Sequence, residues 1–184
     1  MRIVAGTFRS RRLVAPTGHD TRPTSDRARE ALFAMLAEVG DARVLDCFAG
    51  SGALGLEALS RGAATCTFVE RDRTALTALR ANVAALDVAN RCTVRAIDVR
   101  RLLRADAAAG RQYDLFLIDP PYPMLIDVLP ALGRLLGQLA SPGARLALES
   151  AANDEPLVRG FRLDRRRRAG AATLSLFTRA EDPL

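Results

Sequence analysis

The chain has 184 residues, of which 49% are hydrophobic and 26% charged, and its formal net charge is +6. This composition indicates one globular domain with enough apolar residues for a packed core. No apolar run approaches the roughly 18 residues that span a bilayer, and residues 1–6 precede no long apolar region, so neither a membrane span nor a signal peptide is expected. Three cysteines without a CxxC pair favour buried, reduced thiols in a cytoplasmic protein and no metal site.

The positive charge lies at the two ends of the chain. Residues 1–40 hold seven Arg and four acids, a net +3; residues 159–184 hold seven Arg and three acids, a net +4; the segment between them has a net −1. Cationic ends suit a polyanionic partner, because neutralising phosphates releases counterions. There is no Lys, which a GC-rich genome explains, but codon usage does not explain the asymmetry of charge.

The first 40 residues predict an arm that ends in a helix. The arm is basic and turn-rich through His19, which we interpret as incidental, and residues 21–26 lead into the helix with Ser25 or Asp26 as its cap. The helix carries one apolar stripe, formed by Ala28, Leu32, Met35, Leu36 and Val39. This stripe predicts that the helix docks on the body of the protein.

From about residue 42, short β-branched runs alternate with helical runs. Strands are expected at 44–46, 65–70, 93–97, 113–119 and 144–149. Helices are expected at 53–61, 73–86, 99–108 and 125–139, with Asp72 as the cap of the second and a turn at 141–143. This rhythm predicts an α/β fold with a mostly parallel sheet and helices on both faces. Segments 161–168 and 173–177 predict an antiparallel hairpin at the end. We expect a single domain, with an arm at 1–40 and a Rossmann-like body at 41–184.

A glycine-rich turn follows the first strand of the body. Gly50 and Gly52 allow the backbone to approach a ligand at the carboxyl end of that strand, where open parallel sheets bind ligands. Glu70 follows Gly50 by 20 residues, at a position where a carboxylate can accept hydrogen bonds from both ribose hydroxyls. The same spacing also fits a dinucleotide site or a plain structural turn.

Two further acids favour S-adenosylmethionine over a dinucleotide. Asp46, directly before the turn, would repel a pyrophosphate but attract a methionine ammonium group. Asp98, after the third strand, is placed to accept a hydrogen bond from an adenine amino group. Together these acids predict a cofactor site for S-adenosylmethionine.

The fourth strand ends in Asp119-Pro120-Pro121-Tyr122. Two prolines stiffen the loop and remove backbone donors, which leaves the Asp119 carboxylate and the Pro120 carbonyl as fixed acceptors. These two acceptors suit an exocyclic base amine, and Tyr122 can stack on the base in line with a sulfonium methyl. The alternative is a Pro-Pro turn after a buried strand, with Asp119 capping a neighbouring segment.

The glycine turn and the Asp-Pro-Pro-Tyr loop resemble those of amino-methyltransferases that act on DNA adenine or RNA guanine. Residues 1–6, 21–33 and 44–63 also resemble the RsmD family, which methylates N2 of a guanine in small-subunit rRNA, so the resemblance covers nearly the whole chain. It implies the class I S-adenosylmethionine-dependent methyltransferase fold, with a mostly parallel seven-stranded sheet and a C-terminal antiparallel hairpin. The implied target is guanine 966 of 16S rRNA in assembled or late-assembling 30S particles.

The resemblance also implies roles for individual residues. Those that would hold the guanine are Asp119, Pro120, Pro121 and Tyr122; those that would bind the cofactor are Asp46, Phe48, Gly50, Gly52, Glu70, Arg71, Asp98 and Val99; and those that would meet RNA are Arg9, Arg22, Arg27 and Arg29. For the last three arginines the alternative is a helix N-terminus with solvated side chains, including an Arg27–Glu30 pair.

The chain departs from the family near its end. It has Ala169-Gly170-Ala171-Ala172 where relatives carry a Tyr-Gly-Asp-Thr-like turn, so we assign no role to this turn. The preceding run at 165–168 is four arginines that would alternate faces on a strand, so at most half could meet RNA together. Two rival functions remain, a DNA adenine N6-methyltransferase and a non-catalytic RNA-binding assembly factor. A monomer is expected.

Overall fold

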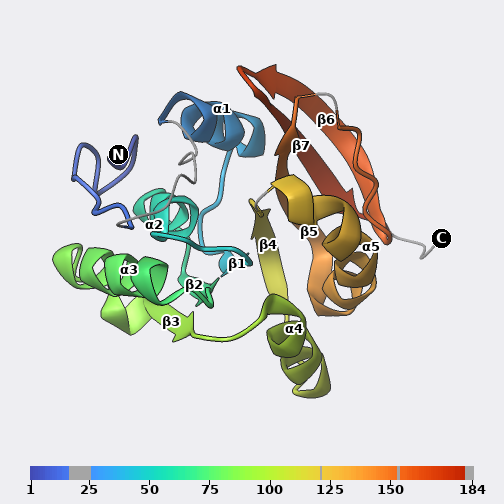
Figure 1. The fold of residues 1–184 in the computed structure, drawn as a ribbon, viewed down its shortest axis with the longest axis horizontal. Helices are drawn as coiled ribbons and strands as arrows, with labels where there is room; N and C mark the ends of the chain where they lie inside the picture. The colour runs from blue at the N-terminus through green and yellow to red at the C-terminus, as the bar shows by residue number, and fades with distance from the viewer. Residues whose placement is uncertain (17–25, 121, 153, 181–184) are drawn as a thin grey trace.

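The computed structural model describes residues 1–16, 26–120, 122–152 and 154–180. A seven-stranded sheet of order β3-β2-β1-β4-β5-β7-β6 forms its centre (Figure 1). The strands are β1 (Arg43–Asp46), β2 (Thr65–Val69), β3 (Cys92–Arg95), β4 (Tyr113–Ile118), β5 (Ala140–Ala151), β6 (Phe161–Ala169) and β7 (Ala172–Arg179). Strands β1 to β5 pair in parallel, and β7 is antiparallel to both β5 and β6. The predicted parallel sheet and terminal hairpin are confirmed.

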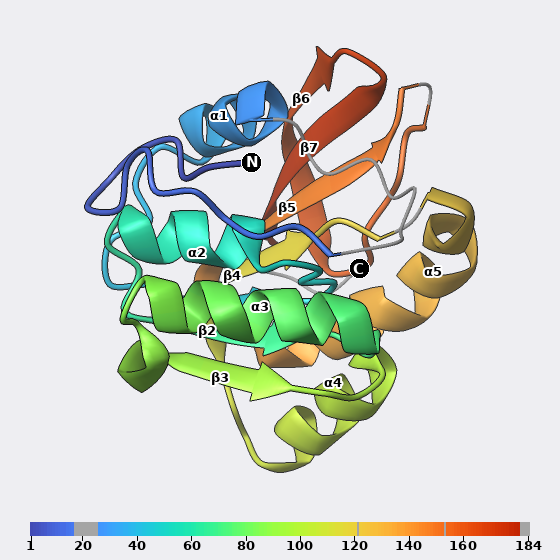
Figure 2. The same ribbon diagram turned by 60° about the vertical axis from the view of Figure 1, so that its left-hand side comes forward.

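Helices cover both faces of the sheet (Figures 1 and 2). One layer contains α1 (Asp26–Leu36), α2 (Ala53–Ser60) and α3 (Arg73–Ala85), and the other contains α4 (Val99–Ala108) and α5 (Tyr122–Leu139). The first layer shares a core with the strand side chains Val44, Leu115, Leu117, Leu174 and Leu176, and we call this side of the sheet the α1–α3 face. The apolar stripe predicted for α1 is buried in this core, because the helix packs on the body rather than standing free.

Two element boundaries differ from the sequence-based expectation by three residues or more. Helix α5 begins at Tyr122, three residues earlier than predicted. A proline is tolerated in the first turn of a helix, because the amides of that turn have no intrahelical acceptor. The predicted turn at 141–143 lies inside β5, where the register shifts from Tyr113↔Ala140 to Leu115↔Arg145. The Ser141 hydroxyl donates to the Tyr113 carbonyl at 3.1 Å, which holds this irregular stretch against β4.

The N-terminal arm is bound to the body through α2 and α3. Its residues 1–13 fold back on themselves through an Arg2↔Arg12 bridge, and Ile3 and Leu13 are buried. Gly6 adopts a φ of 80° and packs so closely on α2 that a Cβ there would lie 1.9 Å from the Ser60 carbonyl oxygen. No helix among the described residues has the length and apolar content to cross a membrane.

Candidate active site

Three predicted acids lie together at the carboxyl ends of neighbouring parallel strands. Asp46 is the last residue of β1, Glu70 follows β2, and Asp119 follows β4. Side chains alternate along each strand, which places all three acids on the α1–α3 face. Burial, together with the nearby charges of Asp119 and Glu70, raises the pKa of Asp46 to about 7. The three carboxylates therefore share one site, as the sequence predicted.

Asp46 is 1% exposed, and only one of its oxygens has a hydrogen-bond donor in the described part of the chain. Oδ2 accepts from the Gly55 amide at 3.0 Å, whereas Oδ1 is buried with no donor. A buried carboxylate oxygen without a donor is costly to the folded protein. The ammonium group of a bound ligand would supply both the missing donor and the opposite charge, so this residue fits the predicted cofactor.

The two predicted glycines have different structural roles. Both have positive φ, 53° at Gly50 and 84° at Gly52. A Cβ at Gly50 would meet no atom within 4 Å, so open space faces this residue, as a ligand site requires. A Cβ at Gly52 would lie 2.4 Å from the Leu79 Cδ1 atom, so Gly52 is required by the packing of α3. The sequence had suggested close ligand approach at both positions.

Glu70 organises the loop beside this open space. Its Oε2 accepts from the Gly50 amide at 2.8 Å, and its Oε1 accepts from the amides of Arg71 and Asp72 at 2.7 and 2.9 Å. The carboxylate is thus held in place by backbone donors from two segments. Each oxygen has lone pairs beyond these bonds, so ribose hydroxyls can still be accepted.

Asp98 has a structural role that the sequence did not indicate. Its carboxylate caps α4 and accepts a hydrogen bond from the Arg100 amide at 3.0 Å. Burial alone would raise its pKa, but the hydrogen bonds and charge of Arg100 and the charge of Arg71 outweigh burial, and the net shift is downward. The Arg71–Asp98 ion pair spans 3.7 Å, so two predicted cofactor residues contact each other. Val99 is buried in the core beneath α4, which leaves only its backbone for a cofactor, and Phe48 packs on the same core.

The predicted acceptor loop begins at the same edge of the sheet. Asp119 is partly exposed and Pro120 is buried; Tyr122 is the first residue of α5, and Pro121 lies outside the described residues. Glu149, which is 7% exposed near the end of β5, is a further acid that the sequence motifs had not indicated. Because Ile118 pairs with Leu148, Glu149 lies beside Asp119 on the adjacent strand. A glutamate that ends an apolar strand was the available signal.

The prediction that Arg29 contacts RNA is wrong in this structure. Its side chain is fully buried, lies 2.8 Å from an Asp26 oxygen and 3.5 Å from a Glu57 oxygen, and donates to the Arg2 carbonyl. The i, i+3 pair that forms in the first turn of α1 is thus Asp26–Arg29. Arg9 and Arg27 are exposed, and Arg22 lies outside the described residues.

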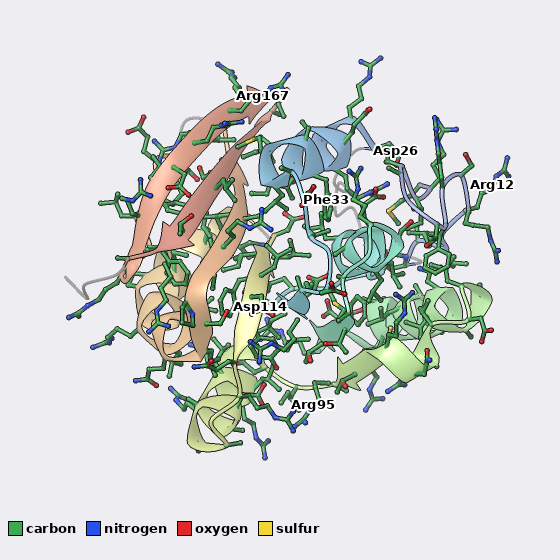
Figure 3. All side chains as sticks on the ribbon, turned by 180° about the vertical axis from the view of Figure 1, so that it is seen from behind. Arg12, Asp26, Phe33, Arg95, Asp114 and Arg167 are labelled. Carbon is green, nitrogen blue, oxygen red and sulfur yellow. The ribbon has the colours of Figure 1, made fainter. Side chains whose placement is uncertain are left out.

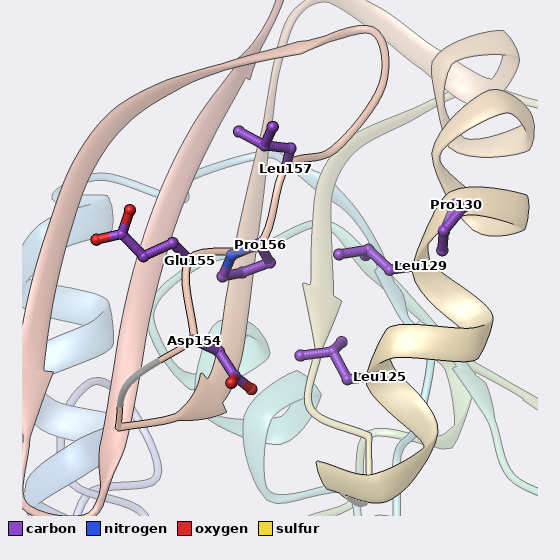
Figure 4. Close-up of a pocket in the computed structure, with 7 residues that line it drawn as sticks. All are labelled: Leu125, Leu129, Pro130, Asp154, Glu155, Pro156 and Leu157. Atoms are coloured by element: carbon purple, nitrogen blue, oxygen red, sulfur yellow. The ribbon is translucent and has the colours of Figure 1, made fainter.

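A groove of about 360 Å³ lies between α5 and residues 154–157 (Figure 4). It is lined by Leu125, Leu129, Pro130, Asp154, Glu155, Pro156 and Leu157. None of the predicted site residues whose side chains the structure describes lines it. The candidate active site is therefore the acidic edge of the sheet rather than this groove.

The strand order, the antiparallel β7 and the acids at the ends of β1, β2 and β4 define the class I S-adenosylmethionine-dependent methyltransferase fold. The family described as Conserved hypothetical protein 95 matches residues 1–178. The chain belongs to this family, which is the RsmD family indicated by its motifs.

Individual relatives agree with this assignment. Over 123 residues, 66% of the chain, it is 46% identical to Ribosomal RNA small subunit methyltransferase D of Escherichia coli K12 and 41% identical to YlbH of Bacillus subtilis. These matches span 60% and 67% of the two relatives, respectively. The solved structure of the Escherichia coli protein yhhF superposes with a TM-score of 0.86 at 35% identity, over 99% of both chains.

Proposed function

We propose that this protein transfers a methyl group from S-adenosylmethionine to the exocyclic N2 amine of a guanine in small-subunit rRNA, with guanine 966 of 16S rRNA as the target. The observation that carries the proposal is the buried Asp46 Oδ1 without a donor, at the same edge of the sheet as Asp119. The name of the Escherichia coli relative supports the substrate class.

Each of three acids would bind a different part of the cofactor. The Asp46 carboxylate would accept from the ammonium group of the cofactor, Glu70 from the ribose hydroxyls, and Asp98 from the adenine amino group. When bound, S-adenosylmethionine supplies an electrophilic methyl group on a sulfonium. The open space before Gly50 leaves room for the ligand against the backbone.

Asp119 and Pro120 would orient the attacking nitrogen. An exocyclic amine is a poor nucleophile because its lone pair is delocalised into the base. Two acceptors that bind its hydrogens fix the nitrogen and make the lone pair more available, and Tyr122 would stack on the base. The new N–C bond forms as the S–C bond breaks, and the nitrogen then loses one proton, with Asp119 as the nearest acceptor. Asp119 need not be a strong base before transfer.

We further propose that the arm and the body act as one cytoplasmic, monomeric domain. The support is local: the backbone amides of Val4 and Ala5 donate to Glu57 of α2 at 2.7 and 3.0 Å, and the Val14 amide donates to Asn82 of α3 at 2.7 Å.

A labelling assay tests the function. Purified protein receives S-adenosylmethionine labelled on its methyl group, together with assembled small subunits, naked rRNA or duplex DNA. We expect label on guanine of the rRNA, with the particle or a late assembly intermediate preferred. Label on DNA adenine would instead make the protein a DNA methyltransferase, and no label on any substrate would support a non-catalytic assembly factor.

A further inference from the structure

The four consecutive arginines of β6 are sorted onto two faces by their pairing with β7. Arg167 pairs with Leu174 and Arg165 with Leu176. Both leucines belong to the core on the α1–α3 face. Because residues paired across a sheet point to the same side, Arg165 and Arg167 also point to the α1–α3 face.

The other two arginines point the opposite way, since Arg166 pairs with Ser175 and Arg168 with Thr173. Arg166 is already compensated there. Its guanidinium lies 3.3 Å from a Glu155 oxygen and donates to the Ser175 hydroxyl at 3.3 Å.

Arg165 and Arg167 are exposed, and neither forms an ion pair or a hydrogen bond in the described part of the chain. They lie about 7 Å apart, one pleat repeat along the strand. Helix α1 packs against β7 and β6, and Figure 3 shows Arg167 beside this helix. The pair therefore presents two uncompensated cations to solvent along the edge of the α1–α3 face.

This face also carries Asp46, Glu70 and Asp119. The register of β4 and β5 aligns Asp119 of the acceptor loop with Glu149. Glu149 pairs with Leu174 of β7, and Leu174 pairs with Arg167 of β6. Arg167 therefore stands in the same row as Asp119, three strands away, which corresponds to about 14 Å at the usual strand spacing. A nucleic-acid strand that places one base at Asp119 would extend its backbone over this distance.

We propose that Arg165 and Arg167 bind backbone phosphates of the RNA that carries the target base, while Arg166 and Arg168 do not. The proposal rests on the proposed function for its substrate. Guanidinium groups suit phosphate because each can donate two parallel hydrogen bonds, and a phosphate would supply the opposite charge that these two side chains lack.

The test compares two double variants with the same change of charge on the same strand. Arg165→Gln/Arg167→Gln removes the pair on the α1–α3 face, and Arg166→Gln/Arg168→Gln removes the pair on the other face. Binding to a naked 16S rRNA fragment is measured by filter retention at several salt concentrations, and methylation is measured on the same RNA. Circular dichroism and the melting temperature establish that each variant is folded.

For Arg165→Gln/Arg167→Gln we expect the KM for rRNA to rise about tenfold or more with kcat little changed. The slope of log K against log salt should fall by about 1.4, because each phosphate contact with single-stranded nucleic acid contributes roughly 0.7. S-adenosylmethionine affinity should be unchanged, and the control variant should change RNA affinity less than threefold. Arg165→Lys/Arg167→Lys keeps the charge and should restore most of the salt slope.

Equal weakening by both Gln variants would show a general charge effect and overturn the assignment of faces. No weakening by Arg165→Gln/Arg167→Gln would overturn it as well. If that variant does not fold, the single variant Arg165→Ala is tested instead, and an unchanged RNA affinity for this folded variant would also count against the proposal. Failure of the proposed function is a separate result, namely that the wild-type protein does not label rRNA guanine although it binds the RNA.

Discussion

Asp46 shows how a single residue can favour binding at the expense of stability. Its carboxylate is buried beside two other acids, and one oxygen has no donor in the described structure. Burial of an ionised group without a partner opposes folding, and the raised pKa expresses that cost. In the proposed function, the ammonium group of the cofactor would offset this cost when it binds.

We predict that Asp46→Asn changes stability and binding in opposite directions. Because the folded pKa, about 7, lies above the ordinary value of 3.8, the protonated form stabilises the folded state at low pH, and this stabilisation is lost as pH rises through about 7. As pH rises from about 4 to about 7, the melting temperature of the ligand-free wild type should therefore fall relative to that of Asp46→Asn. Differential scanning fluorimetry measures this difference.

S-adenosylmethionine affinity should show the reverse pattern. The wild type should bind more tightly at pH 8 than at pH 6, and the variant should lose roughly tenfold to a hundredfold in affinity at pH 8, as expected for a charge-assisted hydrogen bond. Calorimetric titration measures both. An affinity independent of pH in the wild type would show that Asp46 does not bind the ammonium group.

At the acceptor loop, Asp119→Ala should separate chemistry from cofactor binding. The variant should bind S-adenosylmethionine as the wild type does and lose at least about a hundredfold in methyl transfer, the range typical of a positioned acceptor. Glu30→Ala, which removes an exposed carboxylate of α1, serves as a control for the general loss of an acid. Loss of cofactor binding in Asp119→Ala would show that our division of roles is wrong.

At the scale of elements, a buried ion pair joins the arm, α1 and α2. Arg29 of α1 and Glu57 of α2 both have fully buried side chains, and Glu57 also accepts from the first residues of the arm and from Arg61. The pair links segments that are far apart in the sequence. In the described part of the chain, removal of Arg29 would take one of two cations from the buried Glu57, which keeps Arg61. Removal of Glu57 would leave the buried Arg29 with Asp26 alone there.

We predict that Arg29→Met destabilises the protein by about 3–5 kcal/mol, the usual effect of removing one partner of a buried pair. Urea unfolding measures the change. Arg27→Met on the exposed side of the same helix should stay within about 0.5 kcal/mol of the wild type. If Arg29→Met left stability unchanged but weakened RNA binding, the original assignment of Arg29 to RNA would be restored.

The elements themselves were largely predictable. Strand β4 and helices α3 and α4 follow from hydrophobic periodicity and from local caps such as Asp72, whose carboxylate accepts from the Thr74 and Ala75 amides as expected. The irregular start of β5 was not predictable, because Pro142 and Gly143 are local turn signals. The contacts of Ser141 with β4, together with the pairing of Ala140 with Tyr113, keep this segment in the sheet.

At the scale of the whole molecule, the sheet brings its acids together and separates its cations. Arg12 of the arm and Arg167 of β6 lie apart, on opposite sides of α1 in the view of Figure 3. The hairpin inserts β7 between β5 and β6, which places the tip of the hairpin at the same edge of the sheet as Asp119. RNA bound at this edge could therefore contact both the acceptor loop and β6.

The sequence by itself determined the α/β fold and the placing of Asp46, Glu70 and Asp119 at one edge, because parallel strands bring their carboxyl ends together whatever packs around them. The tertiary structure alone decided that Asp46 has a pKa of about 7 and that Arg29 is buried. It also decided which arginines of β6 point to the α1–α3 face. Burial and pairing depend on residues distant in the chain, as in the bond from Val4 to Glu57 across 53 positions, and no local pattern records such contacts.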